Sequence, residues 1–439
     1  MNKILKIFLL LFFIIIPYNE AFPRSLILDT EIENLFEEYT KPLFIAADLP
    51  TDDIKIFVVS DPSINAFVMP NGLIFINSGL LIKADTPNEV ISIIAHEIGH
   101  IVNNHHVTRM IELNNASQSQ AIAAIIGLGT SVTGMLSGND NVTTAGQGIS
   151  VGGSDWAKKK YLRHSRGQEF EADMAAIRIL ESSGNSSRGL ISMLEKIQKE
   201  NFFDTDNINP LDLTHGLPED RINILEPRII EQSHYRRSDE GKLLHKHNLV
   251  RAKLSGYLGL KNTFKKGTIY NDYASVMNTY RNGRINTSIE KIKNLLLKDA
   301  NNPYFYELLA QFYKEIKSYD LALESIRKAN SLLPNHGEIE ALHAEILILT
   351  DKEKEILSGI TMLDKVTSEN EVSTRYLLIL SRAFYKIGNT PKADLYAARY
   401  YAARGQKDRA KSFARRAKKG LEYMTSDWLI ADDIENINF

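Results

Sequence analysis

The sequence of 439 residues contains no cysteine, which excludes disulfide bonds, cysteine nucleophiles and thiolate metal ligands together. Any bound metal must therefore be held by histidine and carboxylate side chains. Neither sign of charge is in surplus, because 52 Lys and Arg residues stand against 54 Asp and Glu residues. Without a basic surplus, the composition gives no case for nucleic acid as a partner.

Long hydrophobic runs are scarce, which argues against a protein with several membrane spans. Residues 7–16 are ten consecutive apolar residues, with Lys3 and Lys6 before them and Pro17 and Ala21 after them. Ten residues are too few to cross a bilayer, so we expect residues 1–21 to be a signal peptide. An uncleaved N-terminal anchor is the alternative. The segment 121–136 is short and contains four glycines and serines, which favours a loop or a small-residue helix.

The rest of the chain has the composition of a folded protein, with 44% hydrophobic and 24% charged residues and room for two or three domains. A helical apolar pattern occupies 26–50, and the β-branched and aromatic segment 54–59 predicts a strand. Two apolar runs, 66–69 and 73–76, flank Pro70-Asn71-Gly72 and predict a hairpin. A helix is expected to begin at Thr86, because Thr86, Pro87 and Glu89 form a capping pattern.

That helix carries the strongest functional signal, the H-E-x-x-H motif His96-Glu97-Ile98-Gly99-His100. Histidines at i and i+4 project from one helix face and can share a zinc ion, while Glu97 beside them can take a proton from water. A catalytic zinc site needs a third ligand. His105 and His106 turn off the ligand face. We expect the third ligand within Glu169-Phe170-Glu171-Ala172-Asp173 on a helix at about 168–182, and spacing alone leaves Glu169 and Glu171 both open.

These motifs resemble the Ste24-like gluzincin metalloproteases, which include the CAAX prenyl proteases and their exported bacterial relatives. The resemblance covers roughly 26–225 and includes HEIGH, EFEAD about seventy residues later, and the segment around the hairpin. The stretch 214–221, THGLPEDR, resembles the His-Pro…Arg element of the family, with Gly216 where proline is common. Asn104 stands where the family often has an arginine, so any role of that arginine is absent here.

The resemblance implies a role for each matched residue. It implies zinc as the cofactor, one ion per chain, with His96, His100 and Glu169 as ligands and Glu97 as the general base. It implies that Asp173 orients a ligating histidine, and that His215 and Arg221 lie beside the open coordination position. There His215 either stabilises the tetrahedral intermediate or caps the zinc at rest. The hairpin implies a substrate-binding edge strand, which we place at 73–77, with these substrate-binding residues: Asn65, Ala66, Leu73, Ile74 and Phe75.

The C-terminal half predicts a tetratricopeptide-repeat array. Small, aromatic and proline residues fall at positions of a 34-residue unit, and Ala344 follows Ala310 by 34 residues. The pattern is lost through 350–370 and returns at Ser381, Phe384 and Ala393. The segment 399–419 holds nine basic residues and Asp408, which favours a solvated helix face, with an acidic partner or a membrane surface as the alternatives. Stacked repeats form a curved surface that can bind a peptide or a partner protein.

The expected fold is an α+β zincin-like metalloprotease domain, mostly helical with a small sheet, followed by an all-α repeat array. We expect a signal peptide at 1–21, the protease domain at 22–260, the repeats at 261–424 and a tail at 425–439. The combination resembles the periplasmic β-barrel assembly-enhancing protease group. It implies a periplasmic zinc endopeptidase that degrades misfolded or stalled outer-membrane proteins, with repeats that bind the client or the assembly machinery. The alternatives are a chaperone or adaptor with a capped site and a membrane-bound prenyl-type protease.

Overall fold

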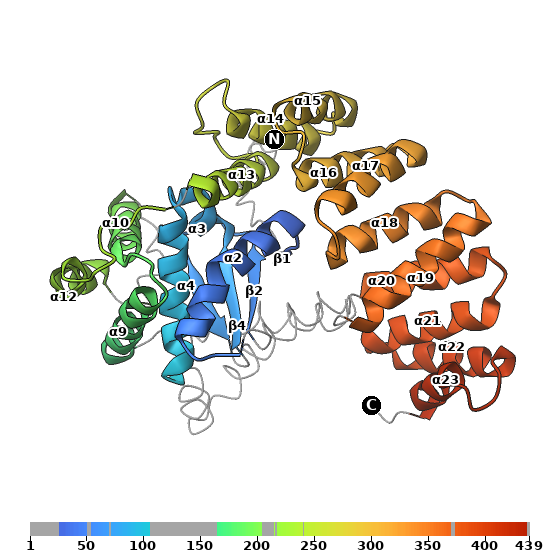
Figure 1. Ribbon diagram of the computed structural model, residues 1–439. Helices are drawn as coiled ribbons and strands as arrows, with labels where there is room; N and C mark the ends of the chain where they lie inside the picture. Colours follow the sequence, from blue (N-terminus) through green and yellow to red (C-terminus); the bar gives the residue numbers. More distant parts are fainter. Residues whose placement is uncertain are drawn as a thin grey trace, which may run out of the picture.

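The computed structural model describes residues 26–50, 54–69, 72–105, 165–203, 215, 217–239, 241–369 and 374–436. Over these residues the protein is mostly helical with one small sheet (Figure 1). The expected signal peptide, the segment 121–136 and His106 lie outside the described residues. Within the described ranges, no helix is both long enough and apolar enough to span a bilayer.

The sheet has four strands in the order β1-β2-β4-β3: β1 (Leu26–Ile27), β2 (Lys55–Val59), β3 (Ala66–Met69) and β4 (Leu73–Asn77). The predicted hairpin is confirmed, because β3 pairs antiparallel with β4 and Phe67 lies opposite Phe75. The expectation that 73–77 is an exposed edge is wrong. On its other side β4 pairs in parallel with β2, with Ile56 opposite Ile74. Of the two hairpin strands, β3 is the one at an edge of the described sheet, and β1 lies at the opposite edge.

The helical pattern at 26–50 gives a helix that begins later than expected. Leu26 belongs to β1, and α2 (Thr30–Ala46) follows it. Asp29 ends the extended segment and caps the helix, since its side chain accepts a hydrogen bond from the Ile32 amide at 3.2 Å. The chain therefore enters the helix only after it has paired with β2.

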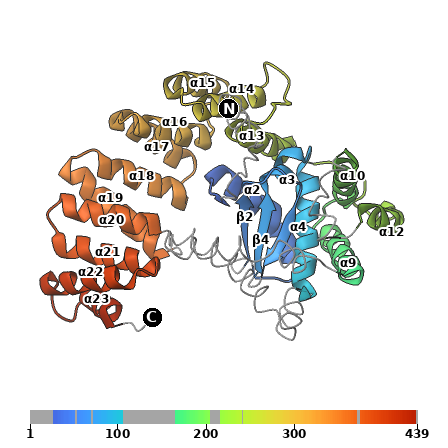
Figure 2. The same cartoon turned by 180° about the vertical axis from the view of Figure 1, so that it is seen from behind.

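The sheet and a group of helices share one hydrophobic core that runs from Ile32 to Leu254. Helix α4 (Pro87–Val102) begins as predicted, with Thr86 as its N-cap and Pro87 as its first residue. It lies beside the sheet, and beyond it lie α9 (Arg166–Ser182), α10 (Arg188–Phe203) and α12 (Pro218–Ile230) (Figures 1 and 2). The short helix α3 (Ser78–Lys83) follows β4 directly. This arrangement encloses the H-E-x-x-H segment of α4.

Helix α13 (Gly241–Tyr257) joins this core to a second one, since Leu254 packs in the first core and Leu249 in the second. Ten described helices then form a curved array that starts next to α13 (Figures 1 and 2). They are α14 (Ile269–Arg281), α15 (Ile285–Lys298), α16 (Pro303–Glu315), α17 (Tyr319–Leu332), α18 (Gly337–Leu349), α19 (Glu353–Glu369), α20 (Thr374–Lys386), α21 (Thr390–Ala403), α22 (Lys407–Gly420) and α23 (Ser426–Asn436).

The spacing of the helices follows the predicted period. Helices α14, α16 and α18 begin at residues 269, 303 and 337, which are 34 residues apart each time. Helix α20 begins at 374, 37 residues later, and α22 at 407, 33 residues later. Within the stretch in which the sequence pattern is lost, residues 353–369 form α19, which has 17 residues where α17 and α21 have 14. The unit that contains α18 and α19 is therefore three residues longer than the 34-residue period.

Three of the nine basic residues in the segment 399–419 form ion pairs with carboxylates of neighbouring helices. Arg416 binds both carboxylate oxygens of Asp394 on α21, with Nε to Oδ2 at 3.0 Å. Arg415 and Lys418 pair with Glu435 of α23. Three alanines of α22, Ala410, Ala414 and Ala417, face the core. These contacts favour the solvated-face interpretation over a surface that attracts an acidic partner.

Candidate metal centre

Two buried histidines project side by side from α4. His96 is 2% exposed and His100 is fully buried, and their Nε2 atoms lie 3.2 Å apart. One helical turn separates them, so both rings point to the same side of the helix. Burial lowers the pKa of His100 to about 3, which keeps this ring neutral and its lone pair available to a metal.

Glu169 of α9 faces the two histidines. Its carboxylate oxygens lie 3.4 Å from His96 Nε2 and 3.5 Å from His100 Nε2. The two helices approach closely at Gly99, where a Cβ would lie 2.5 Å from the backbone oxygen of Ala172. The glycine inside the H-E-x-x-H motif therefore lets α9 bring its carboxylate to the histidines. Of the two carboxylates that the spacing left open, the structure brings Glu169 into the group.

The group fits a tetrahedral zinc ion. Bonds of about 2.0–2.1 Å in that geometry place ligand atoms about 3.3 Å apart, close to the three separations given above. His215 completes a set of four ligand atoms, all within 4.8 Å of one another. Two oxygens in the centre, Glu97 Oε2 and Glu169 Oε1, are buried and accept no hydrogen bond from described residues. Buried carboxylate oxygens normally have a partner, so this environment suits a cation and a water molecule.

Asp173 and Arg221 support the group from behind. Asp173 Oδ1 lies 2.9 Å from His96 Nδ1 and accepts its hydrogen bond when Nε2 faces a metal. Arg221, in the first turn of α12, donates to both oxygens of Asp173, from Nε at 2.9 Å and from the terminal nitrogen at 2.6 Å. Burial favours the neutral form of Asp173, but Arg221 and His96 together lower its pKa below the ordinary value. The carboxylate therefore stays charged and holds the His96 ring.

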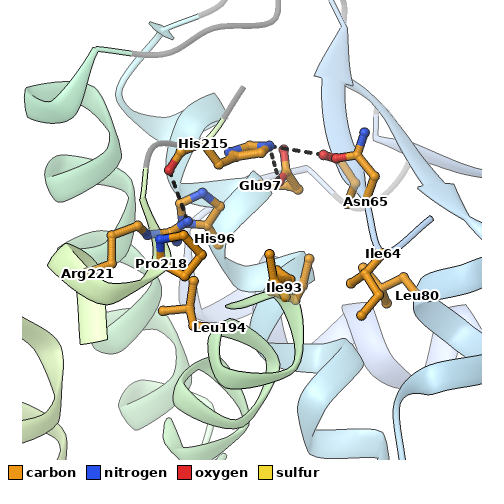
Figure 3. Close-up of a pocket in the computed structure, with 12 residues that line it drawn as sticks. Ile64, Asn65, Leu80, Ile93, His96, Glu97, Leu194, His215, Pro218 and Arg221 are labelled. Carbon is orange, nitrogen blue, oxygen red and sulfur yellow. Dashed lines mark hydrogen bonds and ion pairs between the residues drawn. The ribbon is translucent and has the colours of Figure 1, made fainter. Parts of the chain in front are cut away.

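His215 and Glu97 lie beside His96 and line a pocket together with it (Figure 3). His215 Nδ1 is 3.3 Å from Glu169, and its Nε2 donates to the backbone oxygen of Ala66 at 3.2 Å. Glu97 Oε1 is 3.9 Å from His215 Nε2, and burial raises the pKa of Glu97. A carboxylate with a raised pKa is a stronger proton acceptor, as a general base requires.

A mainly apolar pocket opens beside Glu97. Figure 3 shows His96, Glu97 and His215 on one side of it and Asn65 on another, with aliphatic side chains below. The apolar lining comes from α3, α4, α10 and the segment before β3 and is formed by Ile64, Leu80, Ile93, Leu194 and Ile197. Asn65 and Ala66 line this pocket, whereas Leu73, Ile74 and Phe75 do not.

His105 and Glu171 lie next to the metal group in an arrangement that the sequence does not predict. His105 is 3% exposed, and its Nδ1 lies 2.9 Å from His100 Nδ1, behind the metal group. Its Nε2 lies 3.0 Å from Glu171 Oε2. The motif did identify His105 as a residue off the ligand face. Its contact with His100 depends on how the chain turns after α4, which spacing does not reveal.

Comparison with known proteins agrees with this geometry. Residues 29–229 match the model of peptidase family M48. Over this region the chain is similar to peptidase family M48, and the protein is by class a zinc metalloendopeptidase.

Curated relatives are named for the same class. The beta-barrel assembly-enhancing protease of Escherichia coli is 22% identical over 365 residues, which cover 81% of this chain and 72% of that protein. The putative beta-barrel assembly-enhancing protease of Vibrio cholerae is 29% identical over 214 residues, 47% of this chain and 42% of that one. Metalloprotease LoiP of Escherichia coli is 31% identical over 169 residues, 37% of this chain and 60% of LoiP.

Proposed function

We propose that the protein is a periplasmic zinc endopeptidase that cleaves misfolded or stalled outer-membrane proteins. The observation that carries the proposal is the convergence of His96, His100 and Glu169 on one buried point, with Glu97 at its open side. The names of the assembly-enhancing relatives support the class of client. The signal-peptide pattern of residues 1–21 supports the periplasm.

Each residue of the centre has one task. His96, His100 and Glu169 would hold zinc, which when bound lowers the pKa of its water to about 7 and polarises the scissile carbonyl. Glu97 accepts a proton from the attacking water and can return it to the leaving amine. Asp173, fixed by Arg221, keeps the His96 ring in the tautomer that presents Nε2.

The edge strand β3 supports a substrate held in extended form. The Asn77 amide donates to the Asn65 oxygen, so Asn65 points its backbone toward β4. In an antiparallel pair, hydrogen-bonded and non-hydrogen-bonded positions alternate along each strand. The N–H and C=O groups of Ala66 and Val68 therefore point away from β4, outward from the edge of the sheet. A peptide that pairs with Ala66 and Val68 would be read through its backbone, which favours unfolded clients with little sequence preference. The apolar pocket beside Glu97 would favour an aliphatic side chain next to the cleaved bond.

This substrate model is tested with one protein presented in two states. We expect the full-length chain to cleave an unfolded client and to leave the folded form of the same client intact. Sequencing of the products should show aliphatic residues enriched on one side of the cut. Equal cleavage of the folded and unfolded forms would contradict the edge-strand model.

The second candidate is a chaperone or adaptor whose protease site is capped at rest, and one observation favours it. His215 stands with the metal group on one side, while its Nε2 donates to the outward oxygen of Ala66. It therefore occupies both a coordination position and part of the edge that a peptide would use. Binding by the repeat array would then be the main output.

His215→Ala separates the two candidates. Higher casein cleavage than wild type would show that His215 caps the site. Lower cleavage would make His215 a helper in catalysis, in line with a constitutively active protease. Glu97→Gln in cells adds the complementary result, because a phenotype that survives this substitution rests on binding and not on hydrolysis.

A further inference from the structure

A chain of three side chains runs outward from the metal group on the side of His100. His100 Nδ1 lies 2.9 Å from His105 Nδ1, and His105 Nε2 lies 3.0 Å from Glu171 Oε2. The two histidines are buried, whereas the Glu171 side chain is 62% exposed. The chain therefore leads from the buried metal group to solvent.

Hydrogen-bond chemistry fixes the proton positions in this chain. If His100 binds a metal through Nε2, its neutral ring carries a proton on Nδ1 and must donate there. The atom opposite is His105 Nδ1, which must then be the acceptor and carry no proton. A neutral His105 has its proton on Nε2, where it points at the Glu171 carboxylate. All three groups are satisfied by one arrangement of protons.

The backbone is built to bring His105 back to His100. Helix α4 ends at Val102, and Asn104 has φ of +54°, in the left-handed region that asparagine tolerates better than most residues. The helical path of α4 therefore ends just before His105. The Asn103 side chain donates to the Gly99 oxygen at 2.8 Å, which secures the end of α4.

The chain on His100 has a counterpart on the other histidine. His96 Nδ1 faces a carboxylate directly, that of Asp173 at 2.9 Å. His100 faces a carboxylate through one intervening ring. Both carboxylates and Glu169 belong to α9, and Glu169 and Glu171 lie about 200° apart around that helix. Helix α9 therefore supplies Glu169 to the metal group, Asp173 directly to His96, and Glu171 to His100 through the ring of His105.

We infer that His105 is a positioning residue that fixes the tautomer and orientation of His100, and that Glu171 fixes His105 in turn. The inference rests on the zinc-binding part of the proposed function and is independent of hydrolysis. Groups that hold a ligating histidine from behind are typically worth about 10- to 100-fold in metal affinity.

The test compares variants that keep or remove the acceptor atom. His105→Asn places its Oδ1 at the same number of bonds from Cβ as the histidine Nδ1, so it keeps an acceptor for His100. His105→Leu removes the acceptor and keeps an apolar side chain. In competition with a fluorescent zinc chelator, we expect His105→Leu to weaken zinc binding by about 10- to 100-fold. We expect His105→Asn to retain most of the affinity.

Two further variants serve as matched controls. His247 is as buried as His105 and bonds to the Tyr39 hydroxyl and the Ala84 oxygen, each at 2.9 Å, away from the metal group. His247→Leu should lower the melting temperature and leave zinc affinity unchanged. Glu181 lies at the other end of α9 and accepts from the Ser233 amide at 3.1 Å. Glu171→Gln should weaken zinc binding, and Glu181→Gln should not.

Wild-type affinity in His105→Leu would overturn the inference. So would an equal loss in His105→Asn and His105→Leu, or in His105→Leu and His247→Leu. If His105→Leu does not fold, nitrogen NMR of the zinc-loaded wild type decides: we expect His105 with its proton on Nε2, and a proton on Nδ1 would overturn the inference. Cleavage is not measured in any of these experiments. A failure of the protease proposal, seen as cleavage that survives Glu97→Gln, is therefore a separate result.

Discussion

At the residue scale, Asp173 is the carboxylate on which the orientation of His96 depends. It accepts from the imidazole on one side and from the guanidinium of Arg221 on the other. A charged carboxylate behind a ligating histidine fixes the ring and increases its basicity. The repeat array contains a comparable pair away from the metal centre, because Arg416 donates to both carboxylate oxygens of Asp394. This pair can serve as a control.

Asp173→Asn keeps the shape of the side chain and removes its charge. We expect zinc affinity to fall by about 10-fold or more, because the His96 ring loses its charged partner. Asp394→Asn removes an equivalent Arg pair in the repeat array and should leave zinc affinity unchanged. Chelator competition on both variants measures this. Equal zinc affinity in Asp173→Asn and Asp394→Asn would contradict the role of Asp173.

Much of the centre can be predicted from the sequence at this scale. His96, Glu97 and His100 are fixed relative to one another by one helical turn, so local spacing is sufficient. Glu169 and Glu171 could not be separated by spacing, because the choice depends on how α9 is rotated against α4. That rotation is set where Gly99 meets Ala172, a contact between residues far apart in the chain.

At the scale of elements, the crossing of α4 and α9 determines the geometry of the centre. A methyl group on Gly99 would lie 2.5 Å from the Ala172 oxygen, which is backbone and cannot rotate away. The two helices would have to separate, and Glu169 would move away from the histidines. Gly167, on the same α9, has only the Ser165 hydroxyl oxygen near it, at 3.8 Å.

Gly99→Ala should therefore lower both zinc content and caseinolytic activity by more than about 10-fold. Gly167→Ala should leave both unchanged and stabilise the helix by about 0.5–1 kcal/mol, because alanine restricts the unfolded chain more than glycine. Metal analysis and thermal melts of the two variants check this. Full zinc content in Gly99→Ala would show that the close approach is not needed.

The order of the strands shows a limit of prediction at the element scale. The turn at Pro70-Asn71-Gly72 is a local signal, and it correctly predicted that β3 and β4 pair. Which of the two lies at the edge depends on where β2 joins, and β2 pairs with β4 across the residues between them. No local pattern records that choice, so the sequence predicts an exposed edge at 73–77 where the structure has a strand paired on both sides.

At the scale of the whole molecule, the first helix of the protease region is tied to the repeat array through buried polar contacts. Lys253 of α13 pairs with Glu31 at 3.3 Å, and the Tyr273 hydroxyl of α14 donates to the same carboxylate at 2.9 Å. Thr30 donates to Glu307 of α16 at 2.8 Å. These side chains are buried, so breaking one partner of a pair is costly. The two cores therefore meet at a junction that is held by buried polar contacts.

Glu307 makes this junction sensitive to pH. Burial raises its pKa to about 7, above the ordinary value of 4.5. The folded state therefore holds the proton more tightly than the unfolded chain. The stabilisation that follows from this raised pKa is fully present below pH 4.5. As pH rises from 4.5 to 7 it is lost, and the free energy of unfolding falls by about 3 kcal/mol.

Glu307→Gln remains neutral and can still accept the hydrogen bond from Thr30. We expect the variant to have the same melting temperature as wild type at pH 5 and a higher melting temperature than wild type at pH 8. Glu324, exposed on α17, provides the control, and Glu324→Gln should not change the pH dependence. A Glu307→Gln variant that is less stable than wild type at pH 8 would contradict the assigned sign.

The most direct test of the central claim is the zinc content and caseinolytic activity of the full-length chain beside Glu97→Gln. In the proposed mechanism Glu97 accepts a proton from the attacking water, and it is not among the residues grouped to hold the metal, so the two readouts should separate. We predict one zinc per chain in both proteins, with cleavage reduced by at least about 100-fold in Glu97→Gln. A chain without bound zinc, or cleavage that survives in Glu97→Gln, would contradict the account.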